Sequence, residues 1–337
     1  MGIHIETMFY DSEFPVVYTK SNITLDILSQ PLVWFKPFLS SLGQLLLYRF
    51  KIKPIEQSTA KEMLDTKIIR MEDGTEIMIG MSKHYVKPKA VVLYLHTVSG
   101  NYTQLAHISS MIHQDNIAYV SFTRSGGDPT MNYSKFNFVG RIDELLIVIR
   151  YINQTYPNIP IHAIGASAGS ALLIRYLSKH NSNDQIKSAL LISPGYNFVK
   201  SCENMSMVSR AYLVNKMKHT IKDMVPSEIL KPIRNLDDWI EFQSKMLGYN
   251  SRNEFVQDCD PVYHLHNIKV PTLCLSALDD TIFGNSTEQY VGLPKINSNI
   301  TIVTTKRGGH VMFPDEGHEH PWFMRVTYEW LQNRIGF

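Results

Sequence analysis

The chain has 337 residues, of which 44% are hydrophobic and 19% charged, as in an ordinary globular protein rather than a disordered or fibrous one. Its 33 basic and 31 acidic residues leave a formal net charge of +2, so nothing electrostatic suggests nucleic acid or an acidic partner. The length allows one large α/β domain or two smaller ones.

The cysteines and the N-terminus indicate where the protein resides. Cys202, Cys259 and Cys274 are odd in number and widely spaced, which is typical of a reducing compartment. Residues 1–13 contain acidic side chains and no apolar core of a signal peptide. We therefore expect a cytoplasmic protein.

Residues 1–55 are predicted to be an N-terminal extension that contains an apolar helix. Lys36 and Pro37 interrupt its most apolar part, and Phe38 to Tyr48 is too short to span a bilayer. Such a helix packs on the domain or lies on a membrane surface, which would give a peripheral membrane contact. Both interpretations stay open, with packing the preferred one.

The pattern of residues 56–337 predicts a mainly parallel, doubly wound α/β sheet that begins with an antiparallel hairpin. The hairpin signal is Asp73-Gly74 between two alternating apolar runs. Continuous apolar runs, typical of strands buried on both faces, follow at 90–95, 117–122, 161–164, 189–193, 272–277 and 300–304. Helix-like segments such as 143–153 lie between several of them.

The run from Ile161 to Gly169 contains the pattern Gly-x-Ser-x-Gly between a strand and a helix, with Ser167 at its centre. A serine on such a sharp turn is the nucleophile elbow of serine hydrolases. The residues two before and two after it must be small to avoid colliding with strand and helix. The helix start also directs free backbone N–H groups at the place where an oxyanion would form.

Two further chemical groups follow later strands. Asp279 and Asp280 come directly after the strand at 272–277, and His310 comes after the last strand. Carboxyl ends of parallel strands meet at one edge of the sheet, so these side chains are expected near Ser167. The order Ser, Asp, His suits a catalytic triad in which histidine takes the serine proton and a carboxylate orients the imidazole.

These motifs resemble the α/β-hydrolase superfamily, and within it the type-4 branch of AB-hydrolase-domain esterases and lipases, which includes YheT-like proteins and eukaryotic lipid hydrolases. The similarity runs from about residue 55 to the C-terminus, and its pieces are Tyr156-Pro157-Asn158, the elbow, 245–249, 268–274, 277–280 and 308–310. The resemblance implies an α/β-hydrolase fold, Ser167 as nucleophile and His310 as base. It implies Asp280 as the acid, with Asp279 as the alternative.

The oxyanion loop departs from the family pattern. Relatives carry His-Gly where this chain has His96-Thr97, and threonine resists the positive φ that glycine allows. By position, the oxyanion hole would use the N–H groups of Ala168 and Val98. A displaced second donor would cost on the order of 10² to 10³ in rate. We expect His96 to orient this loop rather than take part in the chemistry.

Between about 195 and 267 the alternation of strands and helices lapses, which predicts a helical cap inserted over the strand ends. Methionine and aromatic side chains there suit an adaptable acyl pocket, although each could equally belong to the core of the cap. These residues are Met205, Met207, Met217, Met224, Met246, Tyr196, Phe198, Tyr212, Trp239 and Phe242.

The sequence as a whole predicts a serine hydrolase that cleaves carboxylic esters, in particular lipid acyl esters, without a cofactor. Two alternatives stay open: an acyltransferase or thioesterase with the same triad, and a catalytically inactive hydrolase-like binding protein. No metal site is expected, because His318-Glu319-His320 lies in a stretch typical of a solvated loop. The oligomeric state is not indicated.

Overall fold

A computed structural model describes residues 16–19, 57–82, 87–98, 100–111, 116–128, 130–135, 138–180, 186–283, 290–313 and 320–336. The predicted apolar helix around Phe38 to Tyr48 lies outside these ranges, as do His318 and Glu319. No helix within the described ranges is both long and apolar enough to cross a bilayer.

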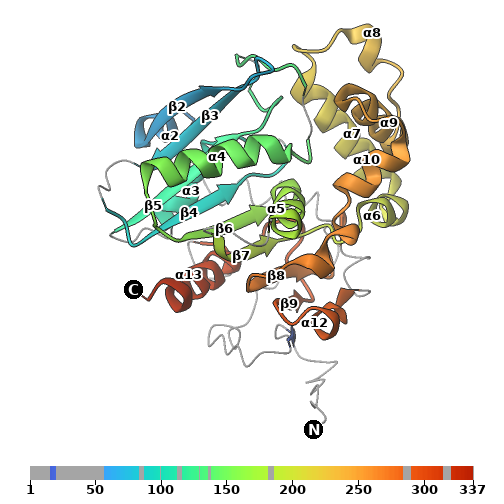
Figure 1. The fold of residues 1–337 in the computed structure, drawn as a ribbon. Coiled ribbons are helices and arrows are strands. Elements are labelled where there is room, and N and C mark those ends of the chain that lie inside the picture. Colours follow the sequence, from blue (N-terminus) through green and yellow to red (C-terminus); the bar gives the residue numbers. More distant parts are fainter. Residues whose placement is uncertain are drawn as a thin grey trace.

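A single sheet runs through the molecule (Figure 1). Its strands are β1 (Val16–Tyr18), β2 (Leu64–Arg70), β3 (Glu76–Ser82), β4 (Ala90–Leu95), β5 (Ile117–Thr123), β6 (Ile161–Ala166), β7 (Ile186–Ile192), β8 (Thr272–Ala277) and β9 (Ile300–Thr305). Over the described residues these nine strands follow the order β1-β9-β8-β7-β6-β4-β5-β3-β2.

The sheet is parallel in its centre and antiparallel at both edges. β5, β4, β6, β7, β8 and β9 pair in parallel, whereas β2 pairs with β3, and β3 with β5, in antiparallel register. The predicted α/β-hydrolase fold with its N-terminal hairpin is confirmed. β1 adds an antiparallel edge against β9 that the sequence pattern did not reveal, since it offers only three residues.

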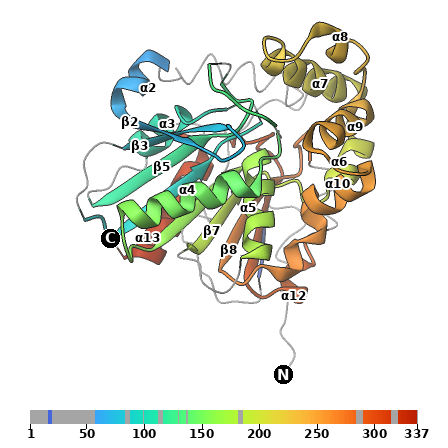
Figure 2. The same ribbon diagram turned by 45° about the horizontal axis from the view of Figure 1, so that its top comes forward.

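Helices cover both faces of the sheet, and Figures 1 and 2 show α4 (Ile142–Thr155) and α5 (Ala168–Lys179) on the same face. The opposite face packs against α3 (Gln104–Met111), α13 (Trp322–Ile335) and, at its margin, α2 (Gln57–Met63). In β4, Val91 and Leu93 pack on the face covered by α4 and α5, and Val92 and Tyr94 pack on the face covered by α3 and α13. A strand buried on both faces needs apolar side chains at every position, which explains the continuous runs.

Several element ends differ from the sequence prediction, and two of them have a clear physical reason. β2 starts at Leu64, ahead of its alternating apolar part, because an edge strand keeps pairing through exposed polar residues that show no alternation. β7 ends at Ile192, one residue early, because Ser193 has a left-handed backbone with φ 46° that cannot continue a strand.

A helical segment lies between β7 and β8 and gathers at one end of the sheet (Figures 1 and 2). It contains α6 (Phe198–Asn204), α7 (Met207–Ile221), α8 (Ser227–Leu230), α9 (Leu236–Leu247), α10 (Arg252–Cys259) and two 3₁₀ turns, η2 (Pro261–Tyr263) and η3 (Leu265–Asn267). A short helix, α12 (Leu293–Ile296), precedes β9. The segment has its own small core, which includes Met205, Val214, Ile221 and Trp239.

Candidate active site

Ser167 stands on a sharp turn between β6 and α5. Its backbone has φ 54° and ψ −113°, a conformation that a non-glycine residue adopts only under strain. The Ser167 N–H donates to the Ile192 carbonyl at 2.9 Å, and its carbonyl accepts from the Ser170 N–H. The turn is thus held by backbone bonds to the next strand and to the helix, and the side chain is left to project from the end of β6.

The two glycines of the motif allow close backbone contacts around this turn. A Cβ on Gly165 would lie 2.8 Å from the backbone of Gly169 and Ser170 at the start of α5. A Cβ on Gly169 would lie 2.1 Å from the carbonyl oxygen of Leu95 at the end of β4. The first glycine therefore makes room for the helix, and the second lets the helix approach a neighbouring strand.

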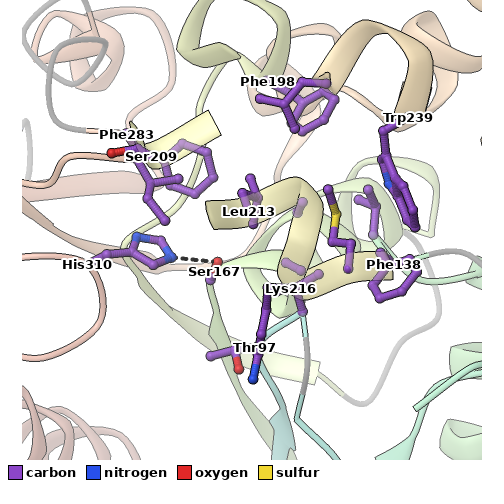
Figure 3. Close-up of a pocket in the computed structure, with 18 of the residues that line it drawn as sticks. Thr97, Phe138, Ser167, Phe198, Ser209, Leu213, Lys216, Trp239, Phe283 and His310 are labelled. Carbon is purple, nitrogen blue, oxygen red and sulfur yellow. Dashed lines mark hydrogen bonds between the residues drawn. The ribbon is translucent and has the colours of Figure 1, made fainter. Parts of the chain in front are cut away.

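The structure brings Ser167, His310 and Asp280 into one hydrogen-bonded chain. Nδ1 of His310 lies 2.8 Å from Oδ2 of Asp280, and Nε2 lies 2.8 Å from Oγ of Ser167 (Figure 3). Because a carboxylate can only accept, Nδ1 carries the proton and Nε2 is free to accept from the serine hydroxyl. Asp280 is 5% exposed, and its other oxygen accepts the backbone N–H groups of Ile282 and Phe283.

Asp279, the alternative acid, has a different partner. Its Oδ1 accepts the Gly309 N–H at 2.8 Å, immediately before His310. On the other side of the histidine, the Val311 N–H donates to Oγ of Ser193 at 3.0 Å. Asp279 and Ser193 thus hold the backbone of the histidine loop from both sides, while Asp280 bonds to the imidazole itself.

The loop after β4 fixes the direction of the Thr97–Val98 peptide. The Thr97 carbonyl accepts from Nη2 of Arg124 at 2.6 Å and from the Gly100 N–H at 3.1 Å, and Nδ1 of His96 lies 2.7 Å from it. The C=O and N–H of a trans peptide point in opposite directions, so the Val98 N–H points away from these groups. Thr97 is not among the residues with positive φ, so its backbone does not adopt the conformation that threonine resists.

Buried charges lie beneath this loop. Burial, with the nearby charge of Arg124, holds the pKa of His96 well below its usual value, so the ring is neutral. Its Nε2 then accepts the Arg124 N–H while Nδ1 donates to Thr97. Burial lowers the pKa of Arg124 to about 10 and raises the pKa of the neighbouring Glu144 to about 7. His96 therefore acts on the loop, as the sequence indicated.

A cavity of about 510 Å³ opens beside Ser167 and His310. Its walls come from the strand-end loops on one side and from α7 and α9 on the other, and most of them are apolar (Figure 3). Of the methionine and aromatic residues singled out in the sequence, four line it: Phe198, Tyr212, Met217 and Trp239. Met205 is buried in the core of the helical segment, and Met207 is 84% exposed.

Sequence reasoning missed several residues around the site. Ser193 directly follows β7, and its position after a strand end was a signal that could have found it. Phe283 packs edge-on against the His310 ring at 5.1 Å, and Lys216 projects into the cavity, but neither belongs to a motif. Within the described ranges, no three His, Cys, Asp or Glu side chains gather as ligands of a metal would.

The chain has the α/β-hydrolase fold, and its sequence is similar to those of phospholipases, lipases and esterases. It is 29% identical over 326 residues to the phospholipase ABHD3 of Bos taurus, which covers 88% of this chain and 75% of that protein. It is 24% identical over 197 residues to the monoacylglycerol lipase ABHD2 of Danio rerio, 50% of this chain and 44% of that protein. No protein-family model matches the chain.

Among solved structures, the chain resembles the Pyrococcus furiosus esterase PF2001, with a TM-score of 0.56 and 17% sequence identity. The match covers 85% of this chain and 96% of the esterase. At this level of identity the likeness establishes the fold. The relatives in sequence are esterases and lipases, so the chain is related to carboxylic ester hydrolases at the level of the family.

Proposed function

We propose that the protein hydrolyses carboxylic esters, and lipid acyl esters in particular, through an acyl-enzyme on Ser167. The observation that carries this proposal is the continuous hydrogen-bonded chain from Asp280 through His310 to Ser167, at the wall of an apolar cavity. The serine is the nucleophile, the histidine the general base, and the aspartate the group that orients the imidazole.

The reaction follows from the positions of the protons along the hydrogen bonds that join Asp280, His310 and Ser167. Nε2 of His310 takes the Ser167 proton as Oγ attacks the ester carbonyl, and Asp280 stabilises the imidazolium that forms. The imidazolium then protonates the departing alcohol oxygen, which leaves the acyl group on Ser167. Water enters, gives its proton to Nε2, and attacks the acyl carbonyl, so that the fatty acid is released and the serine regains its proton.

Two backbone N–H groups are suited to the negative charge on the carbonyl oxygen. Ala168 is the first residue of α5, so no carbonyl one turn earlier in the helix accepts its N–H. The second is the Val98 N–H, which the bonds from Arg124 and Gly100 to the Thr97 carbonyl direct away from the loop interior. Both residues line the cavity with Ser167, which supports their assignment as the oxyanion hole.

The walls of the cavity support an acyl substrate. A volume of about 510 Å³ lies within the range of small-molecule sites and is large enough for a medium acyl chain. Leu213, Met217 and Trp239 provide apolar surface in the cavity walls, and methionine adapts to chains of different shape. The names of the relatives, a phospholipase and a monoacylglycerol lipase, favour the same substrate class.

The first experiment tests Ser167 with p-nitrophenyl esters of increasing chain length. We expect the wild type to hydrolyse the octanoate with a higher kcat/KM than the acetate, because the longer chain fills the cavity. Ser167→Ala should lower kcat by on the order of 10⁴ or more for both esters. A fluorophosphonate probe should label the wild type at Ser167 and leave the variant unlabelled.

The control is Ser170→Ala, since Ser170 lies one helical turn from the nucleophile and donates its hydroxyl to the Gly165 carbonyl instead. This variant should keep its label. Retention of most activity in Ser167→Ala would refute the assignment, and a folded wild type that takes no label would favour a binding protein. A sharp preference for acetate would refute the lipid substrate.

A further inference from the structure

Lys216 occupies a position where a helix normally presents an apolar side chain. The residues of α7 that line the cavity are Ser209, Tyr212, Leu213, Lys216 and Met217. Their spacing of three and four residues is the stripe that a helix turns toward the structure it packs against. Lys216 is thus part of the inner stripe of α7, and its side chain is only partly exposed.

The ammonium group of Lys216 has no bonding partner in the described part of the chain, and no Asp or Glu is among the residues that line the cavity. Two other lysines, by contrast, have partners. Nζ of Lys218, two residues further along α7, donates to the Ile233 carbonyl at 2.9 Å, and Lys179 forms an ion pair with Asp258. A cation left unpaired in an apolar cavity favours a ligand that brings a negative charge.

Lys216 lines the same cavity as Ser167 and His310, which relates it to the proposed reaction. In Figure 3 its side chain extends from α7 toward Thr97, while His310 approaches Ser167 from another side. Thr97 lines the same cavity and adds a hydroxyl group. The site therefore offers an ammonium and a hydroxyl donor near the serine, a combination suited to the oxygens of a phosphate or carboxylate.

We propose that Lys216 selects ester substrates that carry an anionic group, a phosphate or a carboxylate, by binding that group inside the cavity. This selection rests on the proposed ester hydrolysis but involves a different residue from the triad. It also gives Thr97 a role, because the residue that departs from the family pattern supplies a hydroxyl donor in the same cavity. A lysine that merely covers apolar surface with its methylene groups would show no such selection.

The binding test uses a pair of ether lipids that cannot be hydrolysed and that differ by one phosphate, 1-O-octylglycerol and 1-O-octylglycerol 3-phosphate. Isothermal titration calorimetry should give the wild type a Kd at least about tenfold lower for the phosphate, as expected of a charge-assisted hydrogen bond in a partly dry site. Lys216→Met should bring the two Kd values within about threefold, and Lys216→Arg should restore the difference.

A kinetic test covers an anion at the acyl end of the substrate. It compares kcat/KM for p-nitrophenyl butyrate with that for the p-nitrophenyl half-ester of succinate, which carries a carboxylate. If the acyl end carries the anion, Lys216→Met should lower the ratio of succinate to butyrate about tenfold. Loss of selection in the lipid pair alone identifies a phosphate on the alcohol side, and loss in the ester pair alone identifies a carboxylate on the acyl side.

The matched control is Lys222→Met, which removes the same charge from the exposed C-terminal end of α7. At about 0.15 M salt this distant charge is screened, so both ratios should stay at wild-type values. If Lys216→Met changes neither ratio, or if Lys222→Met changes them equally, the proposal is overturned. The ether pair needs no catalysis, so this failure is distinguishable from a failure of Ser167→Ala to abolish hydrolysis.

Discussion

Asp279 and Asp280 are neighbours in the chain whose carboxylates bond to different groups. Asp280 contacts the His310 ring, whereas Asp279 holds the backbone N–H of Gly309. The difference follows from the turn after β8, in which the Asp280 N–H donates to the Ala277 carbonyl and two later N–H groups donate to the Asp280 carboxylate. The turn orients one carboxylate toward the imidazole and leaves the other for the loop.

Asp280→Asn should lower kcat by about 10⁴ while the protein stays folded. The amide oxygen can still accept from Ile282 and Phe283, which leaves the amide nitrogen to face Nδ1 of His310. Since that nitrogen donates, the ring must carry its proton on Nε2 and can no longer accept from Ser167. Steady-state kinetics with a p-nitrophenyl ester and circular dichroism of the folded variant provide the measurement.

Asp279→Asn is the matched control for this substitution. An asparagine oxygen still accepts the Gly309 N–H, so kcat should stay within about tenfold of the wild type. Equal losses in the two variants would mean that both aspartates act only by holding the loop. A larger loss in Asp279→Asn would make Asp279 the triad acid.

At the scale of elements, β6 and β7 are joined by a buried side-chain bond. Nδ1 of His162 lies 2.8 Å from Oγ of Ser188, its partner in the register of the two strands. Burial, together with the nearby charge of Arg334 on α13, lowers the pKa of His162 to about 4. The strand that leads to Ser167 thus contains a histidine that folding keeps neutral.

His162 should make folding stability depend on pH between about 6.5, the ordinary pKa of histidine, and about 4. In this window the unfolded chain binds a proton that the folded chain does not, so stability is present above the window and is lost as the pH falls. The slope from this group is at most about 1.4 kcal/mol per pH unit.

Urea unfolding at about pH 7.5 and about pH 5 measures this effect in the wild type and in His162→Gln, whose amide does not titrate. The free energy of unfolding of the wild type should fall more between the two pH values than that of the variant. Parallel pH profiles would mean that His162 is protonated in the folded protein.

At the scale of the whole molecule, a partly buried ion pair joins the inserted helices to α5, a helix that covers the sheet. Arg175 of α5 is 3% exposed and donates from Nη2 to Oδ2 of Asp258 in α10 at 2.7 Å. Lys179 and the Tyr249 hydroxyl bond to the same carboxylate. Burial raises the pKa of Asp258, but the Arg175 charge and these hydrogen bonds outweigh it and hold the pKa well below its usual range.

Asp258→Asn should lower the free energy of unfolding by about 2 kcal/mol, since it leaves the buried Arg175 guanidinium without its counter-charge. The exposed ion pair between Glu241 and Lys245 is the control, and Glu241→Gln should cost less than about 0.5 kcal/mol. Chemical denaturation measures both. Equal effects would mean that the bond between α5 and α10 contributes no more than a surface pair.

The sequence by itself determined the parts of this protein that depend on local pattern. The Asp73-Gly74 turn, the continuous apolar strands and the glycines around Ser167 each reflect a local demand, for a turn, for burial on both faces or for room beside a Cβ. Ser167, Asp280 and His310 each come after a parallel strand. Their meeting at one edge of the sheet follows from these positions, because the carboxyl ends of parallel strands lie at the same edge.

Only the tertiary structure decided what depends on contacts between distant residues. It bonded Asp280, the acid that the family resemblance implied, to the imidazole. It also paired Val16–Tyr18 with β9 and turned the Thr97 carbonyl toward Arg124. It also sorted the methionines of the inserted helices into cavity, core and surface, and left Lys216 facing the cavity. Local patterns carry no record of the direction in which a side chain points after the chain folds, since packing and hydrogen bonding across the fold set that direction.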